Sequence, residues 1–117
     1  MPMQLSVDFA FCAAHQLPFY DGPCNRMHGH NYRLRVVIEG QPNPKDGMIR
    51  DFEDVRRRTW EVALAPCDHH TLNDFMENPT AENLIVWMWE RLKPQIVGLK
   101  ELRLWETPEY CVTYRED

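Results

Sequence analysis

The sequence lacks the features that would place it in a membrane, in a disulfide-rich class or on nucleic acid. Its only cysteines, Cys12, Cys24, Cys67 and Cys111, show no tight disulfide spacing. No apolar run approaches the roughly 18 residues of a membrane span, and a formal net charge of -5 argues against nonspecific nucleic-acid binding. These absences favour a cytoplasmic protein with reduced thiols, where a cysteine near histidines indicates metal binding or catalysis.

Length and composition are those of one globular domain spanning residues 1–117. The chain has 117 residues, of which 44% are hydrophobic and 26% are charged. It contains no internal repeat and no linker long enough to divide it. The N-terminal stretch alternates and carries Asp8 where a secretory signal needs an unbroken apolar run, so we expect no cleavable signal.

Two strands are predicted in the first third of the chain. In residues 4–15 and again in residues 28–38, apolar and polar side chains alternate with the period of a half-buried strand. The intervening residues are rich in turn formers and predict a loop. The face that carries the apolar side chains includes Leu5, Val7, Phe9 and Phe11 of the first strand and Leu34, Val36 and Ile38 of the second.

Two helices are predicted next, each with a recognisable N-cap. Asp51 precedes residues 52–64, in which apolar side chains recur at helical spacing. Thr80 precedes residues 81–93, which carry an apolar stripe and end before Pro94.

The chain closes with two further predicted strands, residues 99–107 and 109–117, joined by a tight turn. The element order is therefore strand, strand, helix, helix, strand, strand. This order predicts an α+β fold with a four-stranded antiparallel sheet and two helices on one face. Such a sheet has open edges, which predicts oligomerisation through them.

Three histidines form a candidate metal site. His28 and His30 are separated by one residue on a strand, so both imidazoles point to one face, roughly 7 Å apart. If the first two strands form a hairpin, His15 lies opposite this pair. Three neutral nitrogen ligands and one open position are typical of catalytic zinc.

Cys24 admits two interpretations. As a fourth zinc ligand it would close the site and make the metal structural. As a free thiol near a cation it would have a lowered pKa and could serve as a base. The spacing does not choose between them.

Two further positions carry candidate chemistry. Asp68 and His69 form an acid–histidine pair of the kind that tunes a proton shuttle, although adjacent side chains on a loop rarely bond each other and an ordinary turn fits equally. Glu106 closes a strand and could accept two parallel hydrogen bonds from a 2-amino-pyrimidinone edge. The alternative is an exposed acid at the end of a strand.

Taken in order, six segments resemble the 6-pyruvoyltetrahydropterin synthase family, and within it the bacterial 6-carboxytetrahydropterin synthases of queuosine biosynthesis. The resemblance runs from about Leu5 to Tyr114. The segments that carry it are FCAAH, CNRMHGHNY, GMIRDF, CDHHTLND, NPTAEN and LWET.

The resemblance implies a role for each matching residue. His15, His28 and His30 would bind Zn²⁺, and Cys24 would be the catalytic proton acceptor. The remaining assignments are a relay of Asp68 and His69 from a neighbouring subunit, a pterin anchor at Glu106, and a position near the pterin for Thr80. Three subunits would close their sheets into a barrel, and two trimers would stack into a homohexamer with active sites at subunit interfaces.

The implied reaction converts 7,8-dihydroneopterin triphosphate to 6-carboxy-5,6,7,8-tetrahydropterin, acetaldehyde and triphosphate. Two alternatives stay open at this point. One is the sister 6-pyruvoyltetrahydropterin synthase reaction, which eliminates triphosphate without losing carbon. The other is a non-catalytic module whose zinc is structural.

Overall fold

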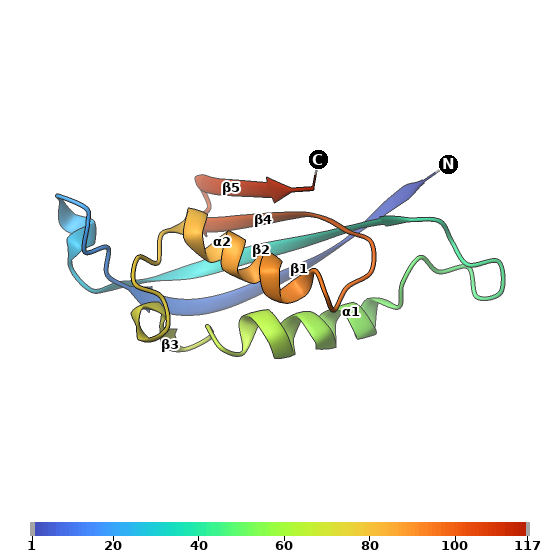
Figure 1. Cartoon of the computed structure of the whole chain (residues 1–117), viewed down its shortest axis with the longest axis horizontal. Coiled ribbons are helices and arrows are strands. Elements are labelled where there is room, and N and C mark those ends of the chain that lie inside the picture. The colour runs from blue at the N-terminus through green and yellow to red at the C-terminus, as the bar shows by residue number, and fades with distance from the viewer. Residues whose placement is uncertain (1, 117) are drawn as a thin grey trace.

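In the computed structural model, which describes residues 2–116, a single twisted sheet carries both helices on one face (Figure 1). The strands are β1 (Met3–His15), β2 (His28–Gly40), β3 (His70–Thr71), β4 (Leu99–Thr107) and β5 (Tyr110–Arg115), in the sheet order β3-β1-β2-β4-β5. The helices are α1 (Phe52–Thr59) and α2 (Ala81–Leu92). The α+β class is confirmed.

The sheet differs from the predicted one by a fifth strand. β3 is only two residues long and runs parallel to β1, pairing with Ala13 and Ala14. The prediction of a purely antiparallel four-stranded sheet was therefore wrong. Two residues are too few for an alternating pattern to mark a strand in a polar connection, which is why the sequence did not reveal it.

β1 and β2 form the long hairpin that determines the site. Their antiparallel register runs from Met3 opposite Gly40 to His15 opposite His28. Because side chains alternate, the odd-numbered residues of β1 and the even-numbered residues of β2 share the face that the helices cover. The loop between the two strands projects from one end of the molecule (Figure 1).

Both helices begin at the predicted caps. The Asp51 side chain accepts a hydrogen bond from the Glu53 N–H, and Thr80 Oγ1 accepts one from the Asn83 N–H. The first helix is not uniformly α-helical, because Trp60–Leu64 form a π-helical turn. The sequence predicted one continuous helix, because the change of hydrogen-bond pattern does not alter the spacing of the apolar residues.

The core lies between the helices and the inner face of the sheet. Its fully buried side chains include Tyr32, Leu34, Ile38, Leu64, Leu72, Leu84, Met88, Leu92, Leu99, Leu102 and Leu104. Burial of these side chains is the main source of stability. His15 is also fully buried, and it lies at the edge of this core. Within residues 2–116 no helix has the length and apolarity needed to cross a bilayer.

Candidate metal centre

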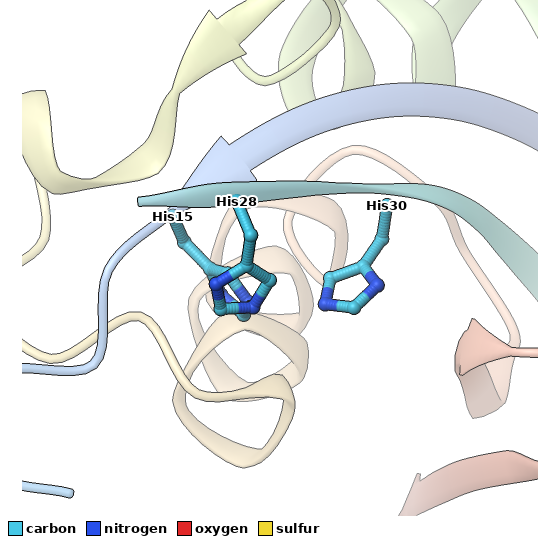
Figure 2. A group of neighbouring side chains, drawn as sticks. All are labelled: His15, His28 and His30. Carbon is cyan, nitrogen blue, oxygen red and sulfur yellow. The ribbon is translucent and has the colours of Figure 1, made fainter. Parts of the chain in front are cut away.

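His15, His28 and His30 converge on one point at the end of the β1–β2 hairpin. Figure 2 shows the three rings on the same side of the β2 ribbon. Their ring centroids are separated by 4.5, 5.1 and 4.9 Å, and one ligating nitrogen of each lies within 4.8 Å of the others. The strand register is responsible, since it places His15 opposite His28 and Ala13 opposite His30.

Main-chain carbonyls fix the tautomers of two of these rings. His15 Nδ1 lies 2.8 Å from the carbonyl oxygen of Pro79, and His28 Nδ1 lies 2.7 Å from that of Arg26. A carbonyl can only accept, so both Nδ1 atoms carry the proton and donate it. Both Nε2 atoms are therefore unprotonated in the neutral rings, and they face each other at 2.9 Å.

Burial favours the neutral form of two of these rings. The pKa of His15 and that of His30 are both lowered, chiefly because the protonated form loses its hydration. His30 Nε2 is buried and has no hydrogen-bond partner, although Glu106 Oε1 lies 3.4 Å away. A neutral imidazole with a free lone pair is the state in which histidine binds a metal.

The residues present fit a divalent cation. Three histidines with carbonyl partners behind two of them match the usual arrangement of protein metal sites, in which the second ring nitrogen is hydrogen-bonded. The 2.9 Å between the two Nε2 atoms is slightly below the roughly 3.3 Å expected of ligands in a tetrahedral zinc site. A cation held by His15 and His28 would remove the repulsion between the facing lone pairs.

Cys24 lies outside this group. It sits in a short 3-10 turn, Pro23–Asn25, with its side chain partly exposed and not in a disulfide. Among the described residues the group of potential ligands contains the three histidines alone. The turn is nevertheless joined to the metal centre, because Arg26 closes it with a hydrogen bond to Pro23 and also accepts from His28.

Asp68 and His69 form the predicted acid–histidine pair, with Asp68 Oδ2 2.9 Å from His69 Nδ1. The contact between neighbouring side chains depends on an uncommon left-handed backbone at His69, with φ 59. The Cys12 N–H donates to Asp68 Oδ1 and, with His69, holds the pKa of this carboxyl below its usual value. The His69 side chain is 79% exposed and, among the described residues, is not part of the three-histidine group.

Glu106 and Thr80 lie on the helix side of the site. Glu106 shares a hollow of about 220 Å³ with Ala81 and Glu82 in the first turn of α2 and with Tyr110 of β5. Thr80 caps α2 and follows Pro79, whose carbonyl holds His15. The Glu106 carboxylate therefore lies between the histidines and this hollow.

Sequence reasoning missed the groups that orient the histidines. The main-chain carbonyls of Arg26 and Pro79 cannot be recognised from the pattern of side chains in the sequence. Tyr32 could have been recognised, because residue parity places it on the same face as His28 and His30. Its hydroxyl lies 3.3 Å from His15 Nδ1. A buried tyrosine two residues beyond the second histidine was the available signal.

Comparison with known proteins relates the whole chain to one family. The model of the 6-pyruvoyl tetrahydropterin synthase family matches residues 4–117. A Synechocystis protein named 6-carboxy-5,6,7,8-tetrahydropterin synthase is 34% identical over 92% of this chain and 88% of its own length. A Pyrococcus furiosus protein named dihydroneopterin monophosphate aldolase is 36% identical over 88% of this chain and 89% of its own.

The fold has a close structural counterpart. The 6-pyruvoyl tetrahydropterin synthase of Caenorhabditis elegans superposes with a TM-score of 0.89 at 28% identity, covering 100% of this chain and 97% of the other. The family model and the structural superposition both extend over almost the whole chain. The chain belongs to the 6-pyruvoyl tetrahydropterin synthase family.

Proposed function

We propose that this protein is a zinc-dependent lyase that converts 7,8-dihydroneopterin triphosphate to 6-carboxy-5,6,7,8-tetrahydropterin, acetaldehyde and triphosphate, as in queuosine biosynthesis. The observation that carries the proposal is the convergence of three histidines beside Glu106. The 34% identity to the Synechocystis synthase supports the choice of reaction. With one water taken up, the atoms of substrate and products balance, and no external oxidant is needed.

Different residues of the chain would bind the metal and orient the substrate. His15, His28 and His30 would hold the zinc ion, which when bound supplies Lewis-acid polarisation of the substrate's side-chain hydroxyls. Glu106 accepts hydrogen bonds from the amino-pyrimidinone edge of the pterin and so orients the ring. Thr80, at the start of α2, lies in the segment that lines the pterin site.

Proton transfer is assigned to two groups. Cys24 is the proton acceptor, since its thiol is not in a disulfide and lies outside the group of potential metal ligands. His69 returns protons as triphosphate leaves and the carbon chain is cut, with Asp68 orienting its ring. A base and an acid on different segments allow removal and return of protons at different substrate atoms.

The relay histidine would come from a neighbouring subunit. His69 is largely exposed within one chain, and its pair with Asp68 lies outside the three-histidine group. β5 forms one edge of the sheet, and most of its side chains are exposed. We propose that sheet edges join three subunits into a barrel and that two trimers form a homohexamer, which brings His69 of one copy to the metal centre of the next.

Product analysis tests the reaction. The metal-loaded protein is incubated with 7,8-dihydroneopterin triphosphate, and products are identified by mass spectrometry. Acetaldehyde with the 6-carboxy pterin is expected, whereas triphosphate release without carbon loss would identify the pyruvoyl reaction. No triphosphate release by metal-loaded protein would refute both.

A second candidate is favoured by the Pyrococcus relative, whose name gives it an aldolase activity on dihydroneopterin monophosphate. The same assay, run with dihydroneopterin monophosphate as substrate, distinguishes this aldolase activity from the synthase reaction. Aldol cleavage of the monophosphate in preference to the triphosphate would replace the proposed substrate.

Variants of cysteine separate catalytic from structural metal. We expect Cys24→Ser to keep its zinc and lose turnover, because the hydroxyl is a far weaker base than a thiolate. Cys12→Ser is the matched control, since Ser can keep the hydrogen bond that the Cys12 thiol donates to Asn31. Loss of zinc from Cys24→Ser would instead favour the structural-zinc alternative.

A further inference from the structure

The segment from Asp68 to Pro79 wraps around the end of β1, where His15 lies. Near its start, the His69 N–H donates to the Cys12 carbonyl, and β3 continues the contact by pairing in parallel with β1. At its end, the Pro79 carbonyl accepts from His15 Nδ1. The segment thus contacts β1 both before the metal ligand and at the ligand itself.

Asn73 makes the central contact of this segment. Its Oδ1 accepts from the Gln16 N–H at 2.8 Å, and its Nδ2 donates to the Gln16 carbonyl at 2.8 Å. One side-chain amide thus satisfies both main-chain polar groups of the residue that directly follows His15. Because the amide is planar and both bonds have good lengths, the two contacts fix the direction in which the chain leaves β1.

The position of this contact matters because the strand ladder stops there. His15 opposite His28 is the last pair of the β1–β2 register, so Gln16 has no partner in the sheet. His15 is fully buried, and its Nε2 must face His28 Nε2 at 2.9 Å. A small rotation of the backbone at Gln16 would turn the buried ring away from that point.

We propose that Asn73 is a positioning residue for the metal centre: by holding the main chain of Gln16, it fixes the orientation of the His15 ring toward His28 and His30. The Pro79 carbonyl then selects the tautomer, and Asn73 holds the backbone that carries the ring. This inference rests on the proposed metal site. It extends that site to a residue 57 positions away from Gln16 in sequence.

Isosteric substitution tests the proposal. Asn73→Asp keeps the acceptor for the Gln16 N–H but sets a carboxylate oxygen against the Gln16 carbonyl. Asn73→Ser removes the amide without adding charge, and it is measured in parallel so that a folding failure of Asn73→Asp leaves a usable variant. Asn43→Asp is the control, since it adds the same charge in a distant turn where Oδ1 only accepts from the Lys45 N–H.

Metal affinity and ligand geometry are the readouts. Zinc affinity is measured by chelator competition, and the visible absorption of the cobalt(II)-loaded proteins reports the coordination of the ion. Loss of a group that orients a ligand typically weakens metal binding about 10- to 100-fold. We expect that loss, with an altered cobalt spectrum, for Asn73→Asp and Asn73→Ser, and wild-type values for Asn43→Asp.

Two results would overturn the positioning role, and a third would refute the metal site itself. Unchanged zinc affinity and cobalt spectrum in a folded Asn73 variant would overturn the positioning role. A lowered Tm of the metal-free Asn73 variants with unchanged zinc affinity would also overturn it, because the contact would then serve the fold alone. Absence of zinc binding by the wild type would refute the proposed metal site itself, independently of Asn73.

Discussion

Removing the proposed zinc ion is expected to lower the Tm of this protein by about 10 °C. Without a cation, the Nε2 lone pairs of His15 and His28 face each other at 2.9 Å, and both Nδ1 protons are committed to carbonyls. Desolvation lowers the pKa of the buried His15, which opposes relief by protonation. The folded metal-free protein therefore carries a repulsion that the unfolded chain does not.

The magnitude follows from linkage and size. A ligand that binds only the folded state at 100 times its Kd stabilises it by about 2.7 kcal/mol. Unfolding entropy is about 2.1 cal/mol/K per residue, which for 117 residues is about 0.25 kcal/mol/K. The ratio of these two quantities is a Tm shift of about 11 °C.

Calorimetric scans of zinc-saturated and chelator-treated protein measure the shift. His28→Gln should abolish it, because the substitution removes one of the three ligands. His70→Gln should keep it, because His70 is exposed and not part of the group. Elemental analysis first verifies that the metal has been lost. If the Tm is then unchanged, or if His28→Gln still shows the full Tm shift, the reasoning is refuted.

Three other predictions concern the fold, the substrate and pH. Gly98→Ala should lower the free energy of unfolding in urea by at least about 2 kcal/mol, because φ is 87 and the new Cβ would lie 2.8 Å from a main-chain oxygen. Gly47→Ala, where φ is 75 and the space is open, should lower it by about 1 kcal/mol. Equal losses in the two variants would contradict the clash. Glu106→Gln should keep its zinc and lower kcat/KM about 10- to 100-fold, since a neutral amide cannot accept both hydrogen bonds from the pterin, and an unchanged value would exclude the anchoring role. Asp68→Asn should destabilise by about 1 kcal/mol at neutral pH. The Cys12 N–H lowers the folded-state pKa of Asp68. The contribution of Asp68 to the free energy of unfolding is therefore complete above the ordinary pKa near 3.8 and vanishes as pH falls through the lowered value. A difference in unfolding free energy between wild type and variant that stays constant from about pH 6 to about pH 3 would contradict this.

Sequence patterns predicted the elements that depend on regular spacing. Alternation marked β1 and β2, and Asp51 and Thr80 act as the N-caps that their position suggested. Elements without a regular period were missed. β3 pairs through two residues, and the π-helical turn after α1 changes only the hydrogen-bond partners.

The pair of Asp68 and His69 shows where local reasoning fell short. Adjacent side chains normally diverge, so the sequence favoured relay and ordinary turn equally. The left-handed backbone at His69 brings the two side chains to 2.9 Å. The Cys12 main chain holds this conformation by bonding to both residues, a contact that no local pattern reveals.

The sequence alone determined that three imidazoles share one face of a hairpin, because side-chain direction in a strand follows from residue parity. Only the tertiary structure decided what surrounds them: the carbonyl of Pro79 on His15, the amide of Asn73 on Gln16, and Glu106 near His30. The physical reason is distance along the chain. Parity acts between neighbours, whereas these contacts join residues 57 to 76 positions apart and exist only once the helices and strands have packed.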